Sequence, residues 1–337
     1  MKLRNIKDDG IKKILIIGFN SVGENLLITP AIKKIKDTYR NSQIDIIVGD
    51  KAVEFVLDNP WFSSYFLWEK MGYYKLIKKL RNQKYDLIID FKTPFFSFFL
   101  KSKYKLTFFM KDILSDKFYI HQSEKIMKFL EPLVGPGEVK IFFPVSNYYR
   151  EKVKEILISF KIKSSDLVVV LIPGGEAVFK RWDKEKYVIL GKELIKRYGV
   201  KIIIIGLKGE EKLTKEIKDL IGSDNVFDLG GKTDLKENFV IFELSDLIVT
   251  NDSYLMYLAC ASGTDIVTIF GPGNPYRYGP VGEKSYVVHS DIDCFPCSSY
   301  KKCKMEYQCI KEVKVEDVFK YCSIILDEKS YPKLFEI

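Results

Sequence analysis

The fold is decided by one stretch, Ser245–Pro280, which reads SDLIVTNDSYLMYLACASGTDIVTIFGPGNPYRYGP. Its first apolar run, Leu247–Thr250, is rich in β-branched residues and predicts a buried strand. A second run, Ile266–Phe270, predicts the next strand, and Gly271 begins a loop of glycine and proline. Two strands joined by a helix are typical of a parallel α/β sheet.

Three polar residues between these strands stand where the helix should begin. Asn251, Asp252 and Ser253 are residue types preferred at helix N-caps. A helix start presents free N–H groups and the positive end of its dipole, which favour a bound anion. In open α/β sheets, ligands bind at the carboxyl ends of strands. The segment by itself predicts either a phosphate site or a purely structural cap.

Length and composition predict a globular protein of two domains. The chain has 337 residues, of which 47% are hydrophobic, and a domain usually holds about 150 residues. The first apolar run, Ile14–Gly18, is too short for a signal sequence or a membrane span. We therefore expect a soluble, cytoplasmic protein.

The charge predicts anionic partners. The formal charge of +9 comes from 54 Lys and Arg against 45 Asp and Glu, and we expect this excess to be spread over the chain. Such a balance favours anionic small molecules or a membrane surface over nucleic acid. Two histidines argue against a multi-histidine metal site.

Strand and helix patterns alternate along both halves of the chain. The predicted strands are 14–18, 44–48, 86–90, 167–172, 201–205, 226–228, 247–250 and 266–270, and the predicted helices are 24–39, 53–57, 73–81, 184–198, 208–220, 235–243 and 315–327. Residues 133–144 contain two glycines and two prolines and read as a linker. This order predicts an α/β fold of two Rossmann-like parallel-sheet domains, residues 1–144 and 145–337, facing each other.

Aromatic and basic residues follow one another in the first half. Residues 95–100 include four phenylalanines, and Lys101, Lys103 and Lys105 come next. Such a patch could rest on an anionic membrane surface. The commoner alternative is that the phenylalanines belong to the core.

A glycine loop follows the first predicted strand. It runs from Gly18 to Gly23, but Asn20 replaces the middle glycine of the dinucleotide fingerprint G-x-G-x-x-G. An NAD-dependent oxidoreductase is therefore only weakly supported. Glu24 opens the following helix, where its carboxylate could accept a proton from a hydroxyl substrate or could merely favour the helix dipole.

The second half has a comparable loop. Residues 173–175 read Pro-Gly-Gly after a strand, and Lys180 and Arg181 follow before the next helix. Small residues let a ligand approach the backbone, and either cation could neutralise a departing pyrophosphate. The alternative is a solvated pair of charges.

Four cysteines lie in segment 294–309, and their spacing is C-x2-C-x5-C-x5-C. They are Cys294, Cys297, Cys303 and Cys309. The gaps match no standard zinc-ribbon or ferredoxin pattern. A structural zinc or iron–sulfur site, disulfides, and free thiols all remain open.

Taken together, the segments resemble glycosyltransferase family 9, the group that includes the ADP-heptose:lipopolysaccharide heptosyltransferases. The segments that carry this resemblance are ILIIGFNSVGENLLITPAI, DNPWFSSYF, KYDLIID, a loop with His121, PGGEAVFKRW, GGKTDL, SDLIVTNDS, TIFGPGNPYRYGP and CFPC. The resemblance implies a GT-B architecture, in which the first domain binds the acceptor and the second binds the nucleotide-sugar. It also implies an inverting transfer that needs no metal or cofactor, from an ADP-sugar or other nucleotide-sugar to a lipopolysaccharide or related glycolipid at the cytoplasmic membrane face.

The resemblance also implies roles for individual residues. Glu24 takes the place of the catalytic base, Lys180 that of the cation on the donor phosphates, and Asp252 with Ser253 that of the pyrophosphate-binding helix start. The remaining predicted donor residues are Gly174, Gly175, Arg181, Asn251 and Gly271, and the predicted acceptor-side residues are Ser21, Gly23, Asn25 and Lys101.

Several positions depart from the family pattern. The base is usually Asp, whereas this chain has Glu24. The helix start usually reads D-S-G-x-x-H, whereas Tyr254 replaces the glycine and Tyr257 the histidine. Gly273 stands where threonine is common. These changes permit an alternative, a glycan- or nucleotide-binding paralogue with altered catalysis.

Overall fold

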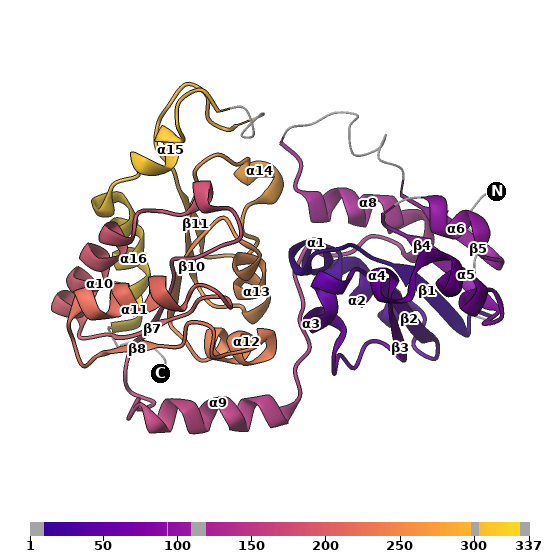
Figure 1. The fold of residues 1–337 in the computed structure, drawn as a ribbon, viewed down its shortest axis with the longest axis horizontal. Helices are drawn as coiled ribbons and strands as arrows, with labels where there is room; N and C mark the ends of the chain where they lie inside the picture. The colour runs from indigo at the N-terminus through magenta and orange to yellow at the C-terminus, as the bar shows by residue number, and fades with distance from the viewer. Residues whose placement is uncertain (1–9, 93, 109–118, 298–302, 331–337) are drawn as a thin grey trace, which may run out of the picture. The chain divides into compact units, whose positions relative to one another are not determined.

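Two parallel sheets organise the chain, one in each of the two units into which it divides (Figure 1). Unit 1 is Met1–Pro144 and unit 2 is Val145–Ile337. The computed structural model describes residues 10–92, 94–108, 119–297 and 303–330. The predicted α/β class with two parallel-sheet domains is confirmed.

The sheet of unit 1 has the strand order β3-β2-β1-β4-β5. Its strands are β1 (Lys13–Ile17), β2 (Gln43–Val48), β3 (Ser64–Leu67), β4 (Tyr85–Asp90) and β5 (Ser102–Thr107). All neighbouring pairs run parallel, and Ile14 pairs with both Ile44 and Leu87. The strand order reverses between β1 and β4, which makes their carboxyl ends the switch point where such sheets bind ligands.

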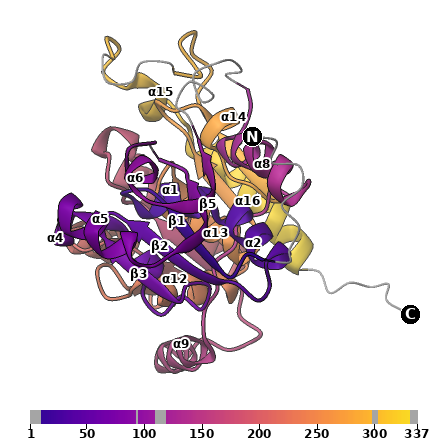
Figure 2. The ribbon, with the colours of Figure 1, turned by 90° about the vertical axis from the view of Figure 1, so that its right-hand side faces the viewer.

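Helices cover this sheet on both faces. They are α1 (Val22–Leu27), α2 (Thr29–Thr38), α3 (Val53–Val56), α4 (Trp68–Met71), α5 (Tyr73–Arg81), α6 (Pro94–Phe99) and α8 (Gln122–Val134). Figure 2, which looks onto unit 1, shows α4, α5 and α6 on one side of the strands and α2 and α8 on the other. Residues of α5 and α6 share a hydrophobic core with Leu15 and Ile17 of β1.

The single helix predicted over residues 24–39 is wrong, because two helices occupy this range. Pro30 stands in the first turn of α2, where its missing N–H costs no hydrogen bond. The hydroxyl of Thr29 donates to the carbonyl of Leu26 at 2.7 Å and accepts from the N–H of Phe142 at 3.0 Å. The hydroxyl of Thr29, at the break between the two helices, therefore also holds residues 141–143 against unit 1, where Ile141 and Phe143 are buried.

The sheet of unit 2 has the order β11-β10-β9-β6-β7-β8. Its strands are β6 (Val168–Ile172), β7 (Lys201–Ile204), β8 (Val226–Asp228), β9 (Leu247–Asn251), β10 (Ile266–Ile269) and β11 (Ser285–Val288). All pairs are parallel, and every residue of β6, β9 and β10 is buried. Here the order reverses between β9 and β6, and their carboxyl ends form the switch point.

The helices of unit 2 are α9 (Asn147–Ser159), α10 (Lys184–Tyr198), α11 (Glu211–Ile221), α12 (Leu235–Glu243), α13 (Tyr254–Ser262), α14 (Pro275–Tyr278), α15 (Gln308–Lys311) and α16 (Val315–Ser330). The first of them, α9, packs on α12, and Arg150 holds Glu243 through two hydrogen bonds of 3.0 and 2.9 Å. α16 packs on α10 and contributes Val318, Ile325 and Leu326 to the core. Across the described ranges, no helix combines the length and hydropathy that crossing a bilayer would need.

Candidate functional site

Polar residues collect at the switch point of each sheet. In unit 1 they follow β1 and β4, and in unit 2 they follow β6 and β9. These loops contain most of the residues that the sequence predicts for binding.

Glu24 lies in the first turn of α1 with its side chain exposed. The hydroxyl of Ser21 donates to Glu24 Oε2 at 2.8 Å, and Ser21 Oγ accepts from the N–H of Glu24 at 3.3 Å. Ser21 therefore caps the helix and also fixes one oxygen of the carboxylate. Ser21 bonds only Oε2, so the second oxygen is suited to accept a proton from a substrate hydroxyl.

The neighbouring Asn25 shapes the loop that precedes Glu24. Its side chain is fully buried, accepts from the N–H of Phe19 at 3.0 Å, and donates to the carbonyls of Phe19 and Ser21. A Cβ at Gly18 would lie 2.4 Å from Asn25 Oδ1, so the glycine makes room for this amide. Gly23 is buried beside it in α1. Asn25 thus positions the loop and is occupied by protein partners.

Lys101 is separated from the other three predicted acceptor-side residues. It immediately precedes β5, whose first residue Ser102 pairs with Tyr85 and whose last residue Thr107 pairs with Asp90. Because the strands are parallel, Lys101 lies at the amino-terminal edge of the sheet, whereas Glu24 lies at the carboxyl-terminal edge. The sequence analysis named Lys101 with the acceptor-side residues without recognising β5, which separates it from them.

Lys92 was missed by the sequence analysis and lies at the switch point of unit 1, just after β4. Its ammonium donates to Asn20 Oδ1 at 2.9 Å and lies 3.5 Å from the centroid of the Trp68 ring. Burial lowers the pKa of Lys92, while the negative charges of Glu24, Glu69 and Asp90 oppose this shift. The sequence signal that could have identified Lys92 is its position two residues after a buried strand that ends in Asp.

An ion pair marks the switch point of unit 2. Lys180 ends a short 3-10 helix, Val178–Lys180, and its ammonium donates to Asp252 Oδ2 at 2.6 Å. The side chains are 23% and 9% exposed. The structure therefore brings together the predicted phosphate-binding cation and the predicted helix start, which are 72 residues apart in the chain.

Two buried polar atoms at this edge lack a hydrogen-bond partner among the residues that the structure describes. They are Ser253 Oγ, at the start of α13, and Arg277 Nε, in α14. A Cβ at Gly175 would lie 3.5 Å from Ser253 Cβ, and Gly175 has a φ of +142°, a backbone conformation that favours glycine. Since buried polar atoms are normally paired, these two point to a missing polar ligand.

Asn251 holds the surrounding loops together. Its amide nitrogen donates to the carbonyls of Pro173 and Gly174 at 2.8 and 3.0 Å. Its oxygen accepts from the N–H of Trp182 and the hydroxyl of Tyr187, both at 3.1 Å. With 1% exposure and four protein partners, Asn251 positions the site and has little capacity left for a ligand.

Glu210 is a second residue that the sequence analysis missed. One carboxylate oxygen accepts from the N–H of Gly175 and from Arg181, both at 2.8 Å, and the other accepts from the N–H of Leu207 at 2.8 Å. Arg181 also donates twice to the carbonyl of Gly175. A Cβ at Gly174 would lie 1.9 Å from Glu210 Oε2. Glu210 and Arg181 thus fix the glycine loop after β6 to the loop after β7.

The loop after β10 packs against the start of α13. A Cβ at Gly271 would lie 2.6 Å from Ile310, and a Cβ at Gly273 would lie 2.7 Å from Asp252 Oδ2. Tyr257 is buried, and its hydroxyl donates to the carbonyl of Tyr278 at 2.9 Å. Burial raises the pKa of Tyr257 well above its usual range, so this residue supplies a neutral donor to α14 where the family has histidine.

The cysteine segment does not assemble a metal site in the described part of the chain, where no group of three or more His, Cys, Asp or Glu could hold an ion. All six cysteines are free thiols, with Cys294 exposed and Cys309 buried. Burial raises the pKa of Cys309 to about 11, which keeps this thiol protonated at neutral pH. The described cysteines form no disulfide, and Cys294, Cys303 and Cys297 lie near enough to Cys309 to add to the rise of its pKa.

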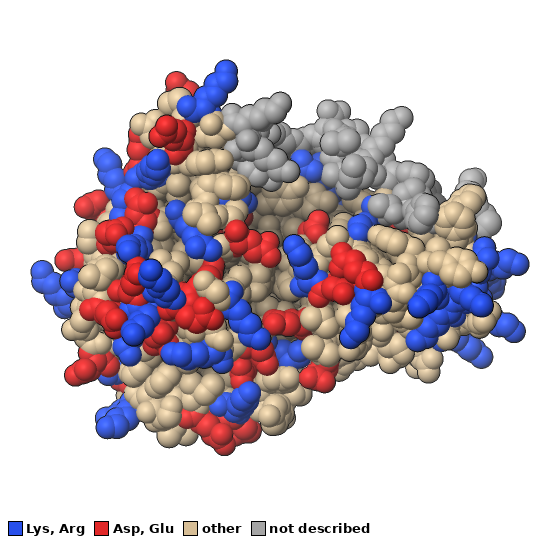
Figure 3. Space-filling model, viewed as in Figure 1, with Lys and Arg blue, Asp and Glu red and all other residues tan. Residues whose placement is uncertain are grey.

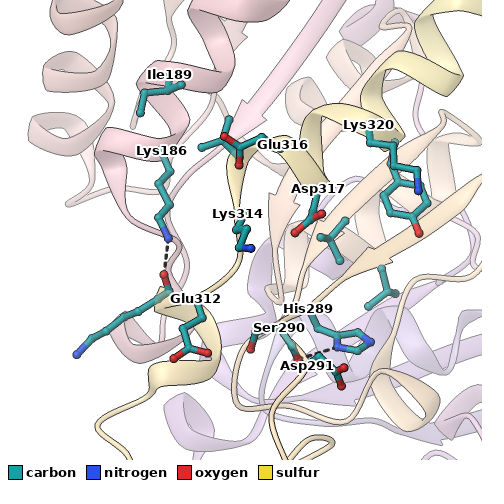
Figure 4. A pocket seen from close by; sticks show the side chains of 15 residues that line it. Lys186, Ile189, His289, Ser290, Asp291, Glu312, Lys314, Glu316, Asp317 and Lys320 are labelled. Carbon is teal, nitrogen blue, oxygen red and sulfur yellow. Dashed lines mark hydrogen bonds between the residues drawn. The ribbon is translucent and has the colours of Figure 1, made fainter.

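A cavity of about 890 Å³ lies elsewhere in unit 2, between α10, the end of β11 and the start of α16 (Figure 4). Its charges are mixed, with lysines facing Glu312, Glu316 and Asp317. Lys186 donates to the backbone carbonyl of Lys311, as Figure 4 shows. None of the predicted donor residues lines this cavity, so we locate the candidate site at the switch point, beside the Lys180–Asp252 ion pair and the unpartnered Ser253 hydroxyl.

Comparison with known proteins identifies the family of the chain. The sequence model described as glycosyltransferase family 9 (heptosyltransferase) matches residues 73–308. A curated relative, lipooligosaccharide heptosyltransferase 2 of Campylobacter jejuni, is 26% identical over 324 residues, which cover 90% of this chain and 95% of the relative. Lipooligosaccharide heptosyltransferase 2 of Haemophilus ducreyi is 26% identical, with coverage of 82% and 88%.

Solved structures share the fold. A glycosyl transferase family 9 protein from Veillonella parvula superposes with a TM-score of 0.79 at 18% identity, covering 97% of this chain and 99% of the other. The ADP-heptose lipopolysaccharide heptosyltransferase II of E. coli superposes with a TM-score of 0.75 at 19% identity, covering 95% and 100%.

Proposed function

Because the chain belongs to glycosyltransferase family 9, and is thus a glycosyltransferase, we propose that it transfers heptose from a nucleotide diphosphate donor. The proposed acceptor is a lipopolysaccharide or a related surface glycan. Curated relatives that align over most of their length carry heptosyltransferase names, which supports the choice of sugar.

One observation carries the proposal for the donor site. The buried hydroxyl of Ser253 has no hydrogen-bond partner among the described residues, and it lies at a helix start beside Gly175 and near the Lys180–Asp252 ion pair. Helix N–H groups, a hydroxyl and a cation together suit the oxygens of a diphosphate. The ion pair with Asp252 holds the Lys180 ammonium in place before the donor arrives, which reduces the cost of ordering it.

The proposed reaction is a direct displacement that inverts the anomeric carbon. Glu24 accepts the proton of the acceptor hydroxyl, whose oxygen forms the new bond while the bond to the diphosphate breaks. Lys180 and the N–H groups at the start of α13 stabilise the negative charge that develops on the departing diphosphate. These groups supply the neutralisation for which many transferases use a metal, so we propose a metal-independent mechanism without a cofactor.

We assign unit 1 to the acceptor and unit 2 to the donor. In unit 1, Ser21, Gly23 and Asn25 shape the loop that presents Glu24, and Lys92 adds a positive charge beside them. The acceptor would be a glycolipid, so the protein would work as a peripheral protein at the cytoplasmic face of the membrane. Nucleic acid has no part in this proposal.

The test compares binding and turnover in three variants. Calorimetry with ADP-heptose should show binding to the wild type, and Lys180→Ala should lower kcat/KM by roughly 10²-fold or more. Glu24→Gln should retain donor affinity and lose about 10²–10⁴-fold in kcat. Lys192→Ala, which changes an exposed lysine of α10, is the matched control and should behave as wild type.

A second function is favoured by Tyr254 and Tyr257, which replace the glycine and histidine of the family pattern. A binding paralogue would bind the nucleotide-sugar without turnover, and Glu24→Gln would then change no measurable property. If no ADP- or UDP-sugar binds and Lys180→Ala alters nothing, the transferase proposal is lost.

A further inference from the structure

The positive charge of the chain is concentrated in two segments of unit 1. Residues 70–85 and 91–108 hold ten of the 54 Lys and Arg and none of the 45 Asp and Glu. The rest of the chain has 44 basic and 45 acidic residues, so these two segments account for the whole net charge of +9. This corrects the expectation that the excess is spread along the chain. The segments contain α5, α6 and β5, and we call their outer surface the basic face.

The two helices of the basic face lie side by side. Leu76 and Leu80 of α5 and Phe96 of α6 belong to the same buried cluster on one face of the sheet. The guanidinium of Arg81 donates to the carbonyl of Phe99 at 2.9 Å, which links the end of α5 to the end of α6. The apolar sides of both helices therefore face the sheet, and the exposed lysines of α5 face outward.

The edge strand β5 adds its lysines to the same side. Thr107 Oγ1 lies 3.3 Å from Ser97 Oγ of α6, so Thr107 points to the side of the sheet that α6 covers. Side chains alternate along a strand, which places Lys103 and Lys105 on that side as well. Figure 3 shows Lys and Arg gathered over this part of unit 1, with few acidic side chains among them.

Exposed aromatic side chains accompany these charges. The exposed basic residues are Lys70, Lys75, Lys78, Lys79, Arg81, Lys84, Lys101, Lys103 and Lys105. Among them lie Tyr73, Tyr74 and Phe98, which are 49%, 79% and 78% exposed. Lysines on an edge strand also discourage pairing with other strands, but that role leaves the lysines of α5 and the exposed rings unexplained. Rings among lysines suit the headgroup layer of a bilayer.

We propose that the basic face docks the protein on an anionic membrane surface. Its lysines and arginines contact the phosphates of acidic phospholipids, and Tyr73, Tyr74 and Phe98 enter the headgroup layer. The inference rests on the proposed function only in that a glycolipid acceptor would lie in the same membrane. Phospholipid binding itself requires neither donor nor acceptor.

The experiment measures cosedimentation of the full chain with vesicles in the absence of any nucleotide-sugar or glycolipid. The wild type should bind vesicles of phosphatidylglycerol and phosphatidylcholine and should bind vesicles of phosphatidylcholine alone weakly. The double variant Lys78→Glu/Lys79→Glu should bind the anionic vesicles roughly tenfold or more weakly. Phe98→Ser should weaken binding while leaving its salt dependence unchanged, because it removes apolar contact and no charge.

The matched control is Lys212→Glu/Lys215→Glu, which makes the same change in net charge on exposed positions of α11 in unit 2. It should retain vesicle binding. Equal losses in the two double variants would show attraction by net charge alone and would overturn the docking face. Equal wild-type binding to both kinds of vesicle would overturn it as well. Because transfer is not measured, a failure here is distinct from a failure of the transferase proposal.

Discussion

At the scale of single residues, Lys92 shows how a partly buried charge opposes stability. Its ammonium is held by Asn20 and the ring of Trp68, yet burial lowers its pKa. A lowered pKa means that the folded state disfavours the charged form. The penalty is fully present below the lowered pKa and disappears as pH rises above the unfolded value near 10.5.

We therefore expect Lys92→Met to raise the melting temperature at pH 7 and to lower the rate of sugar transfer. The stability gain should shrink above pH 10, where the wild-type lysine loses its proton. Thermal unfolding between pH 7 and pH 11 measures the first effect, and a transfer assay measures the second. Lys51→Met, at an exposed position of the same unit, should change stability by less than about 0.5 kcal/mol. A lower melting temperature for Lys92→Met at pH 7 would contradict this account.

Some site residues can be predicted from sequence because they lie in the loop or the first helical turn that follows an apolar strand. Glu24, Lys180 and Asp252 follow apolar, β-branched runs in this way, and an ion pair joins the last two. Asn251 occurs in the same pattern, but its partners come from residues 64 to 78 positions away. Local sequence does not carry such contacts, so it could not show that Asn251 is a scaffold residue.

At the scale of secondary-structure elements, Glu210 links two loops that meet only in the folded sheet. It accepts hydrogen bonds from the loop after β6 and from the loop after β7. Its side chain is 7% exposed, and that of its partner Arg181 is 27% exposed.

We expect Glu210→Ala to lower the free energy of unfolding by about 2–4 kcal/mol, because it leaves two N–H groups and a partly buried guanidinium without their acceptor. Urea unfolding checks this value. Donor affinity should also fall, because the glycine loop loses the carboxylate of Glu210 that accepts its N–H. Glu216→Ala, which removes a solvent-exposed ion pair with Lys184, should lower the free energy of unfolding far less. Equal costs for both variants would exclude the anchoring role.

The strands missed from sequence, β3, β5 and β11, all lie at sheet edges, and the helices α8 and α9 were missed as well. Central strands such as β1, β6 and β9 are apolar and β-branched because helices cover both faces, and this pattern is easily read. The edge strands β3, β5 and β11 carry polar or exposed residues, and β5 has two lysines among its six residues. Edge strands need not be apolar, so their sequences resemble loops.

At the scale of the whole molecule, the boundary between the units follows from the contacts of α9. Arg150 binds Glu243, and Lys152 binds Glu237 at 2.5 Å, so α9 belongs to unit 2 through α12.

We expect residues 145–337, expressed alone, to unfold cooperatively and to bind ADP. Circular dichroism and calorimetry test both outcomes. A piece that begins at residue 160 should be less stable, because α12 loses the helix that covers it. If residues 145–337 aggregate while the full chain remains folded, unit 2 depends on unit 1.

The uneven charge of the chain has a consequence for how it meets a surface. Its entire excess lies on two segments of unit 1, and the charges of the remainder sum to almost zero. The field near an acidic bilayer decays over about 8 Å in physiological salt, so within that distance it attracts the basic face more strongly than the rest of unit 1. The protein would therefore be turned with α5 and β5 toward the lipids before the first contact, so that orientation precedes adhesion.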